Sequence, residues 1–176
     1  MKSFLDPTEI LKQLKLRKNM IAADFGSGSG GWAIPLSEKL EEGKVYAIDL
    51  LEEPLSALRA RAKTEKIFNI QTVLANVEKG IDILRDDSCN LVLMTNLFFQ
   101  CQDMKKILSE GQRVLKSDGR ILIVDWQKDS PLTEQVEKVS FEKIKRIALE
   151  LGLKVEKEFE AGPYHYALIF EKQERR

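Results

Sequence analysis

The chain has 176 residues, of which 43% are hydrophobic and 32% are charged. This size and balance predict one globular domain spanning 1–176, and they argue against a disordered or fibrous chain. The 28 basic and 28 acidic residues cancel, so nucleic acid is not expected as the main partner, because binding to phosphates needs a basic surface. Composition leaves the oligomeric state open.

Cysteine and histidine are scarce. Cys89 and Cys101 are the two cysteines and His165 is the single histidine, which is too few for a disulfide scaffold or a metal centre. No metal is therefore expected, and the reducing cytoplasm is the expected compartment. The first ten residues lack an apolar signal core, and no run approaches the ~20 apolar residues of a membrane span. We expect folding to start at residue 1, with no span.

A short lead-in helix is predicted at the N-terminus. Asp6 fits the N-cap, Pro7 the first helical position and Glu9 the capping partner. The buried stripe of this helix would be Ile10, Leu11 and Leu14.

Short apolar runs then alternate with helical patterns. Most runs are apolar at consecutive positions, as in strands buried on both faces. The runs are 20–24, 44–49, 70–75, 90–95 and 120–125. Apolar residues spaced by three and four predict crossover helices over 32–40, 55–62 and 104–115. The segment 76–88 is the weakest, with one helical turn expected at 81–84.

The C-terminal part predicts a helix followed by a hairpin. The helix begins near Phe141 and stops at Gly152. Two strands, 153–159 and 165–171, are joined by a connection too short for a crossover, so they must be antiparallel. The predicted fold is α/β: a doubly wound, mostly parallel seven-stranded sheet with one antiparallel strand.

Ligands of such sheets bind beyond the carboxyl ends of the strands. Polar side chains stand at five predicted strand ends, namely Asp24, Asp49, Asn76, Asn96 and Asp125. Any one of them can simply start a turn or cap a helix. Five on one edge predict a site for a polar ligand.

The strongest motif is DFGSGSGG at 24–31, between the first strand and the first crossover helix. Its glycines let the backbone approach a ligand and aim amide groups at it. Gly26, Gly28 and Gly31 satisfy the dinucleotide pattern GxGxxG, which keeps a nicotinamide enzyme as an alternative. The carboxylate of Asp24 counts against it, because it would repel a pyrophosphate and attract a cation.

A ligand with a cationic amino acid end, a ribose and an adenine fits this edge better. Asp49 ends the second strand, where an acidic side chain can hold ribose hydroxyls. The chain also contains no Tyr-x-x-x-Lys pair and is short for a dehydrogenase.

These residues carry a family resemblance. DFGSGSG resembles motif I of the class I S-adenosylmethionine-dependent methyltransferases, and VYAIDLLEEPL resembles their second strand. LANVEKG, CNLVLMTNLFFQCQD and RVLKSDGRILIVDW resemble the ends of their third, fourth and fifth strands. PYHYALIF resembles the terminal hairpin of small, single-domain members related to the quinone-biosynthesis C-methyltransferases. The resemblance covers nearly the whole chain in order.

The resemblance implies a Rossmann-like methyltransferase fold with S-adenosylmethionine as cofactor. The cofactor-binding residues that it implies are Asp24, Gly26, Ser27, Gly28, Gly30, Asp49, Leu50, Asn76, Val77 and Asn96. The chain departs from the family at 117–119, which reads Ser-Asp-Gly where Pro-Gly-Gly is common, and it lacks the histidines that many relatives carry after Asn96.

Methyl transfer from a sulfonium is an in-line displacement, so positioning can supply most of the catalysis and a base is optional. His165, Tyr164 and Asp125 are the candidate catalytic residues, because all three are expected at the edge where the methyl group lies. The alternative for His165 is a structural or exposed residue, for Tyr164 hydrogen-bonded packing, and for Asp125 capping of a helix or turn.

Aromatic side chains are candidates to surround the sulfonium group of the cofactor. Trp126, Phe98 and Phe99 are the candidates, with core packing as the alternative, and Trp32 is assigned mainly to packing. Cys101 could suggest thiol chemistry such as arsenic binding, which is disfavoured because no third cysteine exists.

The expected function is therefore methylation of a small-molecule acceptor, which the sequence does not identify. Protein or RNA methylation and a non-catalytic S-adenosylmethionine-binding module are the alternatives, and a nicotinamide oxidoreductase comes last.

Overall fold

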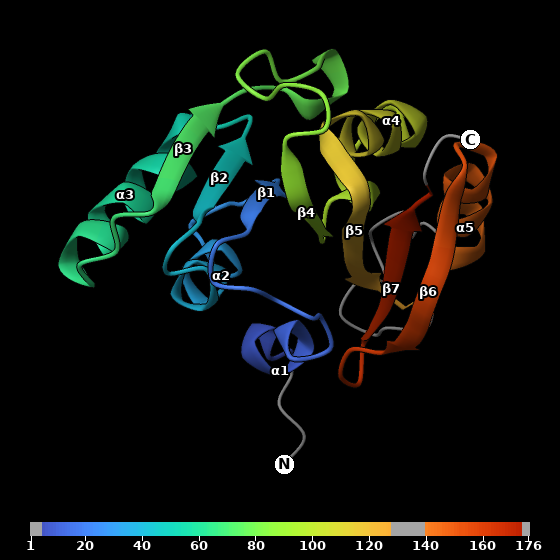
Figure 1. Cartoon of the computed structure of the whole chain (residues 1–176), viewed down its shortest axis with the longest axis horizontal. Helices are drawn as coiled ribbons and strands as arrows, with labels where there is room; N and C mark the ends of the chain where they lie inside the picture. The colour runs from blue at the N-terminus through green and yellow to red at the C-terminus, as the bar shows by residue number, and fades with distance from the viewer. Residues whose placement is uncertain (1–4, 128–139, 174–176) are drawn as a thin grey trace.

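A seven-stranded sheet forms the centre of the computed structural model, which describes residues 5–127 and 140–173 (Figure 1). The strand order is β3-β2-β1-β4-β5-β7-β6. The strands are β1 (Ile21–Phe25), β2 (Lys44–Asp49), β3 (Ile70–Leu74), β4 (Cys89–Thr95), β5 (Leu115–Trp126), β6 (Leu153–Glu160) and β7 (His165–Lys172).

One strand is reversed. The pairs among β1 to β5 are parallel, whereas β7 runs antiparallel to both β5 and β6. The short connection between β6 and β7 leaves no room for a crossover, which is the physical reason for the reversal. The predicted fold class is confirmed.

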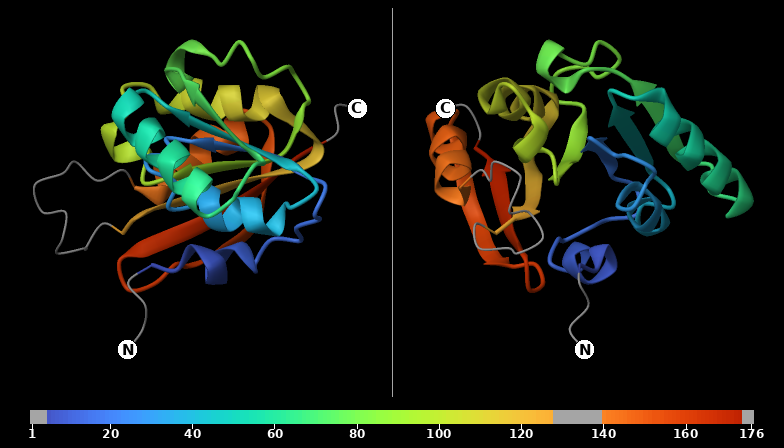
Figure 2. Two further views of the ribbon diagram at one scale, coloured as in Figure 1. Left: turned by 90° about the vertical axis from the view of Figure 1, so that its left-hand side faces the viewer. Right: turned by 180° about the vertical axis from the view of Figure 1, so that it is seen from behind.

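Helices cover both faces of the sheet (Figures 1 and 2). They are α1 (Pro7–Leu11), α2 (Ala33–Lys39), α3 (Glu52–Thr64), α4 (Met104–Val114) and α5 (Phe141–Glu150), with the 3-10 helices η1 (Val77–Lys79) and η2 (Phe98–Gln100). The apolar residues of α4 and α5 pack into one core, and those of α1, α2 and α3 into the other. Within the described ranges, no helix has the length and apolar character that crossing a membrane requires.

The lead-in helix forms as predicted, with one difference. The Asp6 carboxylate accepts hydrogen bonds from the backbone N–H groups of Thr8 and Glu9. Glu9, expected to complete the capping box, instead pairs with Lys12 at 2.5 Å. The ammonium one turn further along the chain competes successfully for that carboxylate.

Segment 76–88 contains the predicted turn and a second one. Residues 81–84 form a turn in which the N–H of Leu84 donates to the carbonyl of Ile81 at 3.0 Å. The 3-10 helix η1, capped by Asn76, precedes it and was not predicted. Helix α4 holds the turn at 81–84 in place: Glu110 Oε1 accepts from the N–H of Ile81 at 2.7 Å, and Arg113 donates to the carbonyl of Leu84 at 2.9 Å.

Strand β5 is longer than expected. It begins at Leu115, which was assigned to the preceding helix, and its pairing with β4 shifts register between Cys89 and Leu91. Strand β1 runs one residue later than predicted, so that it ends at Phe25.

The terminal hairpin turns at the edge expected from topology. His165, the first residue of β7, pairs with Trp126, the last residue of β5. Gly152 adopts φ +83°, the left-handed conformation that ends α5 before β6 begins. The hairpin turn and the carboxyl ends of the parallel strands therefore share one edge.

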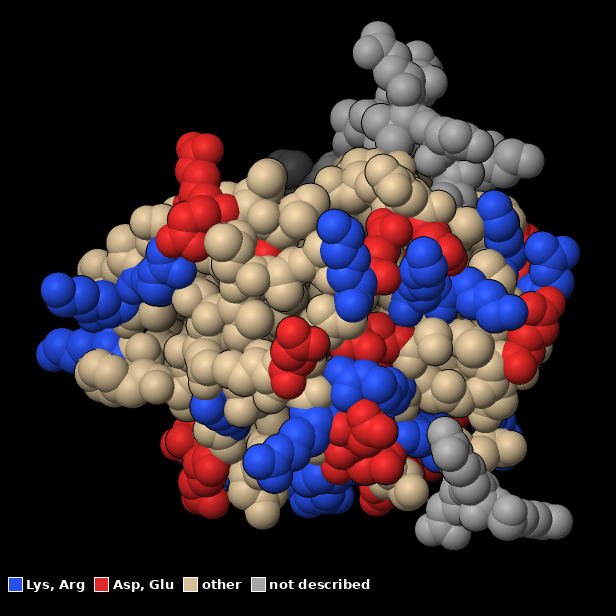
Figure 3. Space-filling model, turned by 90° about the horizontal axis from the view of Figure 1, so that it is seen from above, with Lys and Arg blue, Asp and Glu red and all other residues tan. Residues whose placement is uncertain are grey.

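Charges are interspersed on the face that Figure 3 shows. Lys and Arg side chains alternate there with Asp and Glu side chains, without a single-sign field. Among the described residues, this face shows no basic patch of the kind that would neutralise a phosphate backbone.

Candidate active site

The glycine-rich turn after β1 is held by β2. The N–H groups of Gly26 and Ser27 both donate to the carbonyl of Ile48 at 2.9 Å, and the N–H of Gly28 donates to Asp49 Oδ2 at 2.8 Å. These amides are therefore used within the protein, which differs from the expectation that they point at a ligand. The turn can therefore contribute to ligand binding through the space that its glycines leave, and not through these N–H groups.

Gly28 marks open space. Its φ is +53°, and a Cβ built on it would meet no atom within 4 Å. Gly26 (φ +73°) lies against Leu97, whose Cδ1 would be 2.9 Å from a Cβ. Gly30 differs, because a Cβ there would come within 2.3 Å of Leu58 Cδ1. The absence of a side chain at Gly30 therefore lets the turn pack closely against α3.

Asp24 is a buried carboxylate without a hydrogen bond. Its relative exposure is 0%, and neither oxygen has a partner within the part of the chain that the structure describes. Burial, with a smaller contribution from the charge of Asp49, raises the pKa of Asp24 to about 7. Buried polar groups without partners are rare because they cost on the order of 1–3 kcal/mol each.

Two neighbouring groups share this property. Ser27 Oγ and Asn96 Oδ1 are also buried without a hydrogen-bond partner among the described residues. Asp24 is the penultimate residue of β1, Ser27 lies two residues after this strand, and Asn96 directly follows the adjacent strand β4. Together they offer an anionic, hydrogen-bonding environment that an ammonium group would satisfy.

Asp49 both stiffens the turn and keeps capacity for a ligand. Besides the bond from Gly28, its Oδ1 accepts from the N–H of Leu51 at 3.0 Å. A carboxylate has about four acceptor positions, so about two remain for hydroxyl groups of a ligand.

A cavity of about 270 Å³ lies beside Asp49. Asn76 Oδ1 accepts from the N–H of Glu78, which leaves the side-chain NH₂ as a donor. Leu50 is 63% exposed at the mouth and can cover a flat ring. The lining residues are Gly26, Asp49, Leu50, Leu51, Ala75, Asn76, Val77, Glu78, Leu97, Gln100, Cys101, Gln102 and Ile107.

Glu78 is a site residue that the sequence did not reveal. Its two carboxylate oxygens accept from the N–H groups of Gln102 at 2.9 Å and Asp103 at 3.1 Å. These bonds tie the segment after η2 to η1 across the cavity. No motif signals this contact, because it joins two loops that are distant in the sequence.

The structure separates the candidate catalytic residues. Side chains of a strand alternate between faces. Asp125 points to the α4/α5 side, where Oδ2 accepts from the N–H of Phe98 at 3.1 Å, and burial raises its pKa to about 6. His165 is fully buried on the other face, stacked on Trp126 with ring centroids 4.1 Å apart, and burial lowers its pKa to about 4. Neither His165 nor Tyr164 lines the cavity beside Asp49.

The aromatic candidates are divided as well. Phe98 is 1% exposed and belongs to the core, and Trp32 is buried in the opposite core. Phe99 and Trp126 are partly exposed. Phe98 and Trp32 therefore act in packing.

Cys101 is poorly suited to thiol chemistry. Its Sγ donates to the carbonyl of Phe98 at 3.2 Å, and burial, with Glu78 nearby, raises its pKa to about 11. Cys89 lies at the opposite end of β4.

Fold and site together define a Rossmann-like protein with a cavity beside Asp49 and, close enough for Asp49 to influence its pKa, the buried carboxylate of Asp24. The family model described as "Methyltransferase domain" matches residues 23–123. The chain belongs to this family, for which S-adenosylmethionine is the cofactor expected from the sequence.

Individual proteins that are similar to this chain include methyltransferases. A demethylmenaquinone methyltransferase from Shouchella clausii is 26% identical over 154 residues, which cover 86% of this chain and 64% of the relative. This chain thus spans under two thirds of that relative's length. A SAM-dependent methyltransferase from Aquifex aeolicus has a similar structure, with a TM-score of 0.86, 27% identity and coverage of 95% of this chain and 89% of that one. The YcgJ protein from Bacillus subtilis has a TM-score of 0.80 at 16% identity and covers 97% of this chain and 99% of its own.

Replacing Glu78 by Ala should weaken binding of S-adenosylhomocysteine by about tenfold, because two charge-assisted hydrogen bonds that hold the cavity wall are lost. Calorimetric titration measures this. Glu53→Ala, an exposed carboxylate on α3, is the control and should bind normally. Equal affinities in the two variants would show that the wall needs no such tie.

Proposed function

We propose that the protein transfers the methyl group of S-adenosylmethionine to a small-molecule acceptor. The observation that supports this most is the buried Asp24 carboxylate, which has no hydrogen bond from the described residues. An ammonium group beside it would repay the cost of burial. S-adenosylmethionine combines such a group with a ribose and an adenine, in the order that Asp24, Asp49 and Asn76 follow across β1, β2 and β3.

When bound, S-adenosylmethionine supplies an activated methyl group on a sulfonium. The chain's own residues hold its parts: Asp24 the ammonium, Asp49 the ribose hydroxyls, and the Asn76 NH₂ group an adenine nitrogen. Gly28 leaves the room that the ligand needs. Catalysis then comes mainly from fixing the acceptor in line with the methyl carbon.

Asp49→Ala should weaken binding of both S-adenosylmethionine and S-adenosylhomocysteine. Losing charge-assisted bonds to the ribose costs about 1.5–3 kcal/mol, which corresponds to roughly 10- to 150-fold in Kd. Calorimetry of both ligands, with Asp82→Ala on an exposed carboxylate as the control, measures the effect. Binding of NADH, with no response to S-adenosylmethionine, would overturn the proposal.

The roles of Asp125, His165 and Tyr164 remain proposals. Asp125 shares its face with the segment of η2 that borders the cofactor cavity, so we propose it as the group that orients or deprotonates the acceptor. We propose that His165 positions Trp126 by stacking. Asp125→Asn should then lower turnover by about 100-fold, whereas His165→Phe, which keeps a stacked ring, should retain most of it. The reverse order would assign the base to His165.

Transfer of a labelled methyl group to a small molecule in cell extract separates an enzyme from a non-catalytic S-adenosylmethionine-binding module. Label in a filtrate that excludes macromolecules supports the proposal, and label on protein or RNA contradicts it. We also propose the cytoplasm as the location, because Cys89 and Cys101 are free thiols.

A further inference from the structure

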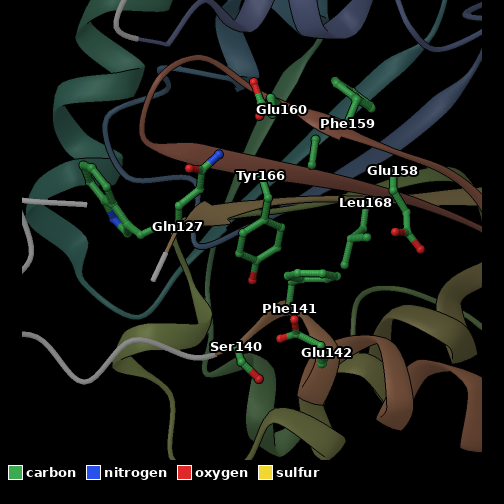
Figure 4. A pocket seen from close by; sticks show the side chains of 11 residues that line it. Gln127, Ser140, Phe141, Glu142, Glu158, Phe159, Glu160, Tyr166 and Leu168 are labelled. Carbon is green, nitrogen blue, oxygen red and sulfur yellow. The ribbon is translucent and has the colours of Figure 1, made fainter. Parts of the chain in front are cut away.

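A second and larger cavity, of about 510 Å³, lies between the start of α5 and the strands β6 and β7 (Figure 4). Its lining combines aromatic rings with carboxylates, among them Trp126, Phe141, Tyr166, Glu142, Glu158 and Glu160. None of these residues lines the cavity beside Asp49. This acceptor cavity, as we call it below, is large enough for a molecule of about two fused rings, since ligand pockets start near 300 Å³.

The floor of the cavity is aromatic. The rings of Phe141 and Tyr166 lie 5.7 Å apart, tilted by 51°. Figure 4 shows the Tyr166 hydroxyl directed toward the same space as Phe141 and Glu142. That hydroxyl is buried and has no hydrogen-bond partner among the described residues. Burial, with the charges of Asp125 and Glu142, raises the pKa of Tyr166, so the group stays a neutral hydroxyl.

The charged groups around the cavity are acidic. Glu142, Glu158 and Glu160 line it, and no Lys or Arg stands among the described lining residues. Glu158 forms an ion pair with Lys145. Glu142 and Glu160 have no ion-pair partner in the described part of the chain. Such a mouth attracts cations and repels anions, and aromatic faces add to the attraction for a cation.

Asp125 connects the segments that line the two cavities. Leu97 lines the cofactor cavity, and the next residue, Phe98, donates its N–H to Asp125. Asp125 is directly paired with Tyr166, which lines the acceptor cavity, and both side chains lie on the same face of the sheet. Asp125 thus contacts a neighbour of the cofactor cavity on one side and a wall residue of the acceptor cavity on the other.

We propose that this cavity binds the methyl acceptor, and that the acceptor is a flat apolar molecule carrying a basic nitrogen. This inference rests on the proposed function. The bound ammonium first gives a proton to Asp125 or to water, which frees the nitrogen lone pair. The lone pair then forms a bond to the methyl carbon while the carbon–sulfur bond breaks, and the sulfur leaves as the neutral thioether with the electron pair. The product is the N-methylated ammonium. Atoms and charge balance without an oxidant or a metal.

Binding can be tested without the unknown acceptor, using three probes of one shape. These are 2-naphthylmethylamine, 2-naphthylmethanol and 2-naphthoate, titrated by calorimetry into the full chain. The amine should bind at least about tenfold more tightly than the carboxylate, with the alcohol between them, because the charged groups among the described lining residues are all carboxylates. Equal binding of all three, preference for the carboxylate, or no binding of the amine would overturn the proposal.

Two variants locate the site. Glu142→Gln should weaken binding of the amine by about threefold to tenfold and leave the affinity for the alcohol unchanged. Tyr166→Phe should weaken binding of both the amine and the alcohol, since each can form a hydrogen bond with the Tyr166 hydroxyl. Glu150→Gln, at the far end of α5, is the matched control and should change neither. All variants should bind S-adenosylhomocysteine normally, which shows that they are folded. Unchanged amine affinity in both variants would place the probe elsewhere and contradict the proposal.

A third measurement separates this inference from the proposed function. With labelled S-adenosylmethionine and cell extract, the labelled small-molecule product should be retained by a cation exchanger at neutral pH. A labelled small molecule that is neutral or anionic would overturn the inference and leave the function intact. No methyl transfer at all, despite binding of S-adenosylmethionine, would overturn the proposed function.

Discussion

Replacing Asp24 by Asn is expected to abolish tight binding of S-adenosylmethionine while making the cofactor-free protein more stable. Removing one partner of a buried ion pair costs about 3–5 kcal/mol, so Kd should rise by at least about 100-fold. The stability gain arises because an ionised carboxylate buried without partners is unfavourable, on the order of a few kcal/mol for a pKa raised from 3.8 to about 7. Calorimetry and thermal unfolding near pH 8 measure the two effects.

The pH dependence provides an internal check. In the folded protein Asp24 has a pKa of about 7, above its unfolded value of 3.8. The folded state therefore binds more protons between these values, and the stability of the cofactor-free protein should fall as pH rises through that window. Affinity for the cationic cofactor should run the opposite way, rising up to about pH 7 and levelling above it. Both dependences should be lost in Asp24→Asn, whereas Asp82→Asn should keep them. A flat affinity profile in the native chain would contradict contact between Asp24 and the ammonium.

Gly28→Val is expected to eliminate detectable cofactor binding and to cost about 1–2 kcal/mol of stability. The φ of +53° is strained for a β-branched residue, and the added side chain would fill the open space above the turn. Affinity for S-adenosylhomocysteine, measured together with the free energy of unfolding, tests both parts.

Gly80→Val is the matched control for this variant. Gly80 also has a positive φ, +92°, with nothing within 4 Å of a built Cβ, but it follows η1 and lies outside the glycine-rich turn that Asp49 holds. It should lose similar stability and keep its affinity. Loss of binding in both variants would mean that strain, and not occupation of the site, disturbs the cofactor.

Much of the fold was predictable because its signals are local. Runs of consecutive apolar residues predicted strands buried on both faces, and the short link between 160 and 165 could only form a hairpin. The polar residues at the ends of the first three strands, Asp24, Asp49 and Asn76, were found for the same reason. Parallel strands bring their carboxyl ends to one edge, so position along the chain translates directly into position in space.

The remaining features depended on contacts between segments that are distant in sequence. The turn at 81–84 was predicted, but the hydrogen bonds from Glu110 and Arg113 that hold it against α4 were not. Bonds to β2 used up the amides of the glycine-rich turn, which a motif cannot reveal.

The acceptor side shows the same limit. Sequence placed Asp125 and His165 at one edge, and alternation along the paired strands put their side chains on opposite faces of the sheet. Glu142 and Tyr166 come from α5 and β7, and only the packing of that helix on the sheet brings them to one cavity. The sequence by itself thus determined the fold, the family and the edge at which we propose that the cofactor binds, because these follow from local periodicity and strand order. Tertiary packing decided the cavity walls, the raised pKa of Asp24 and the acceptor cavity, because burial and charge at a point depend on every segment that meets there.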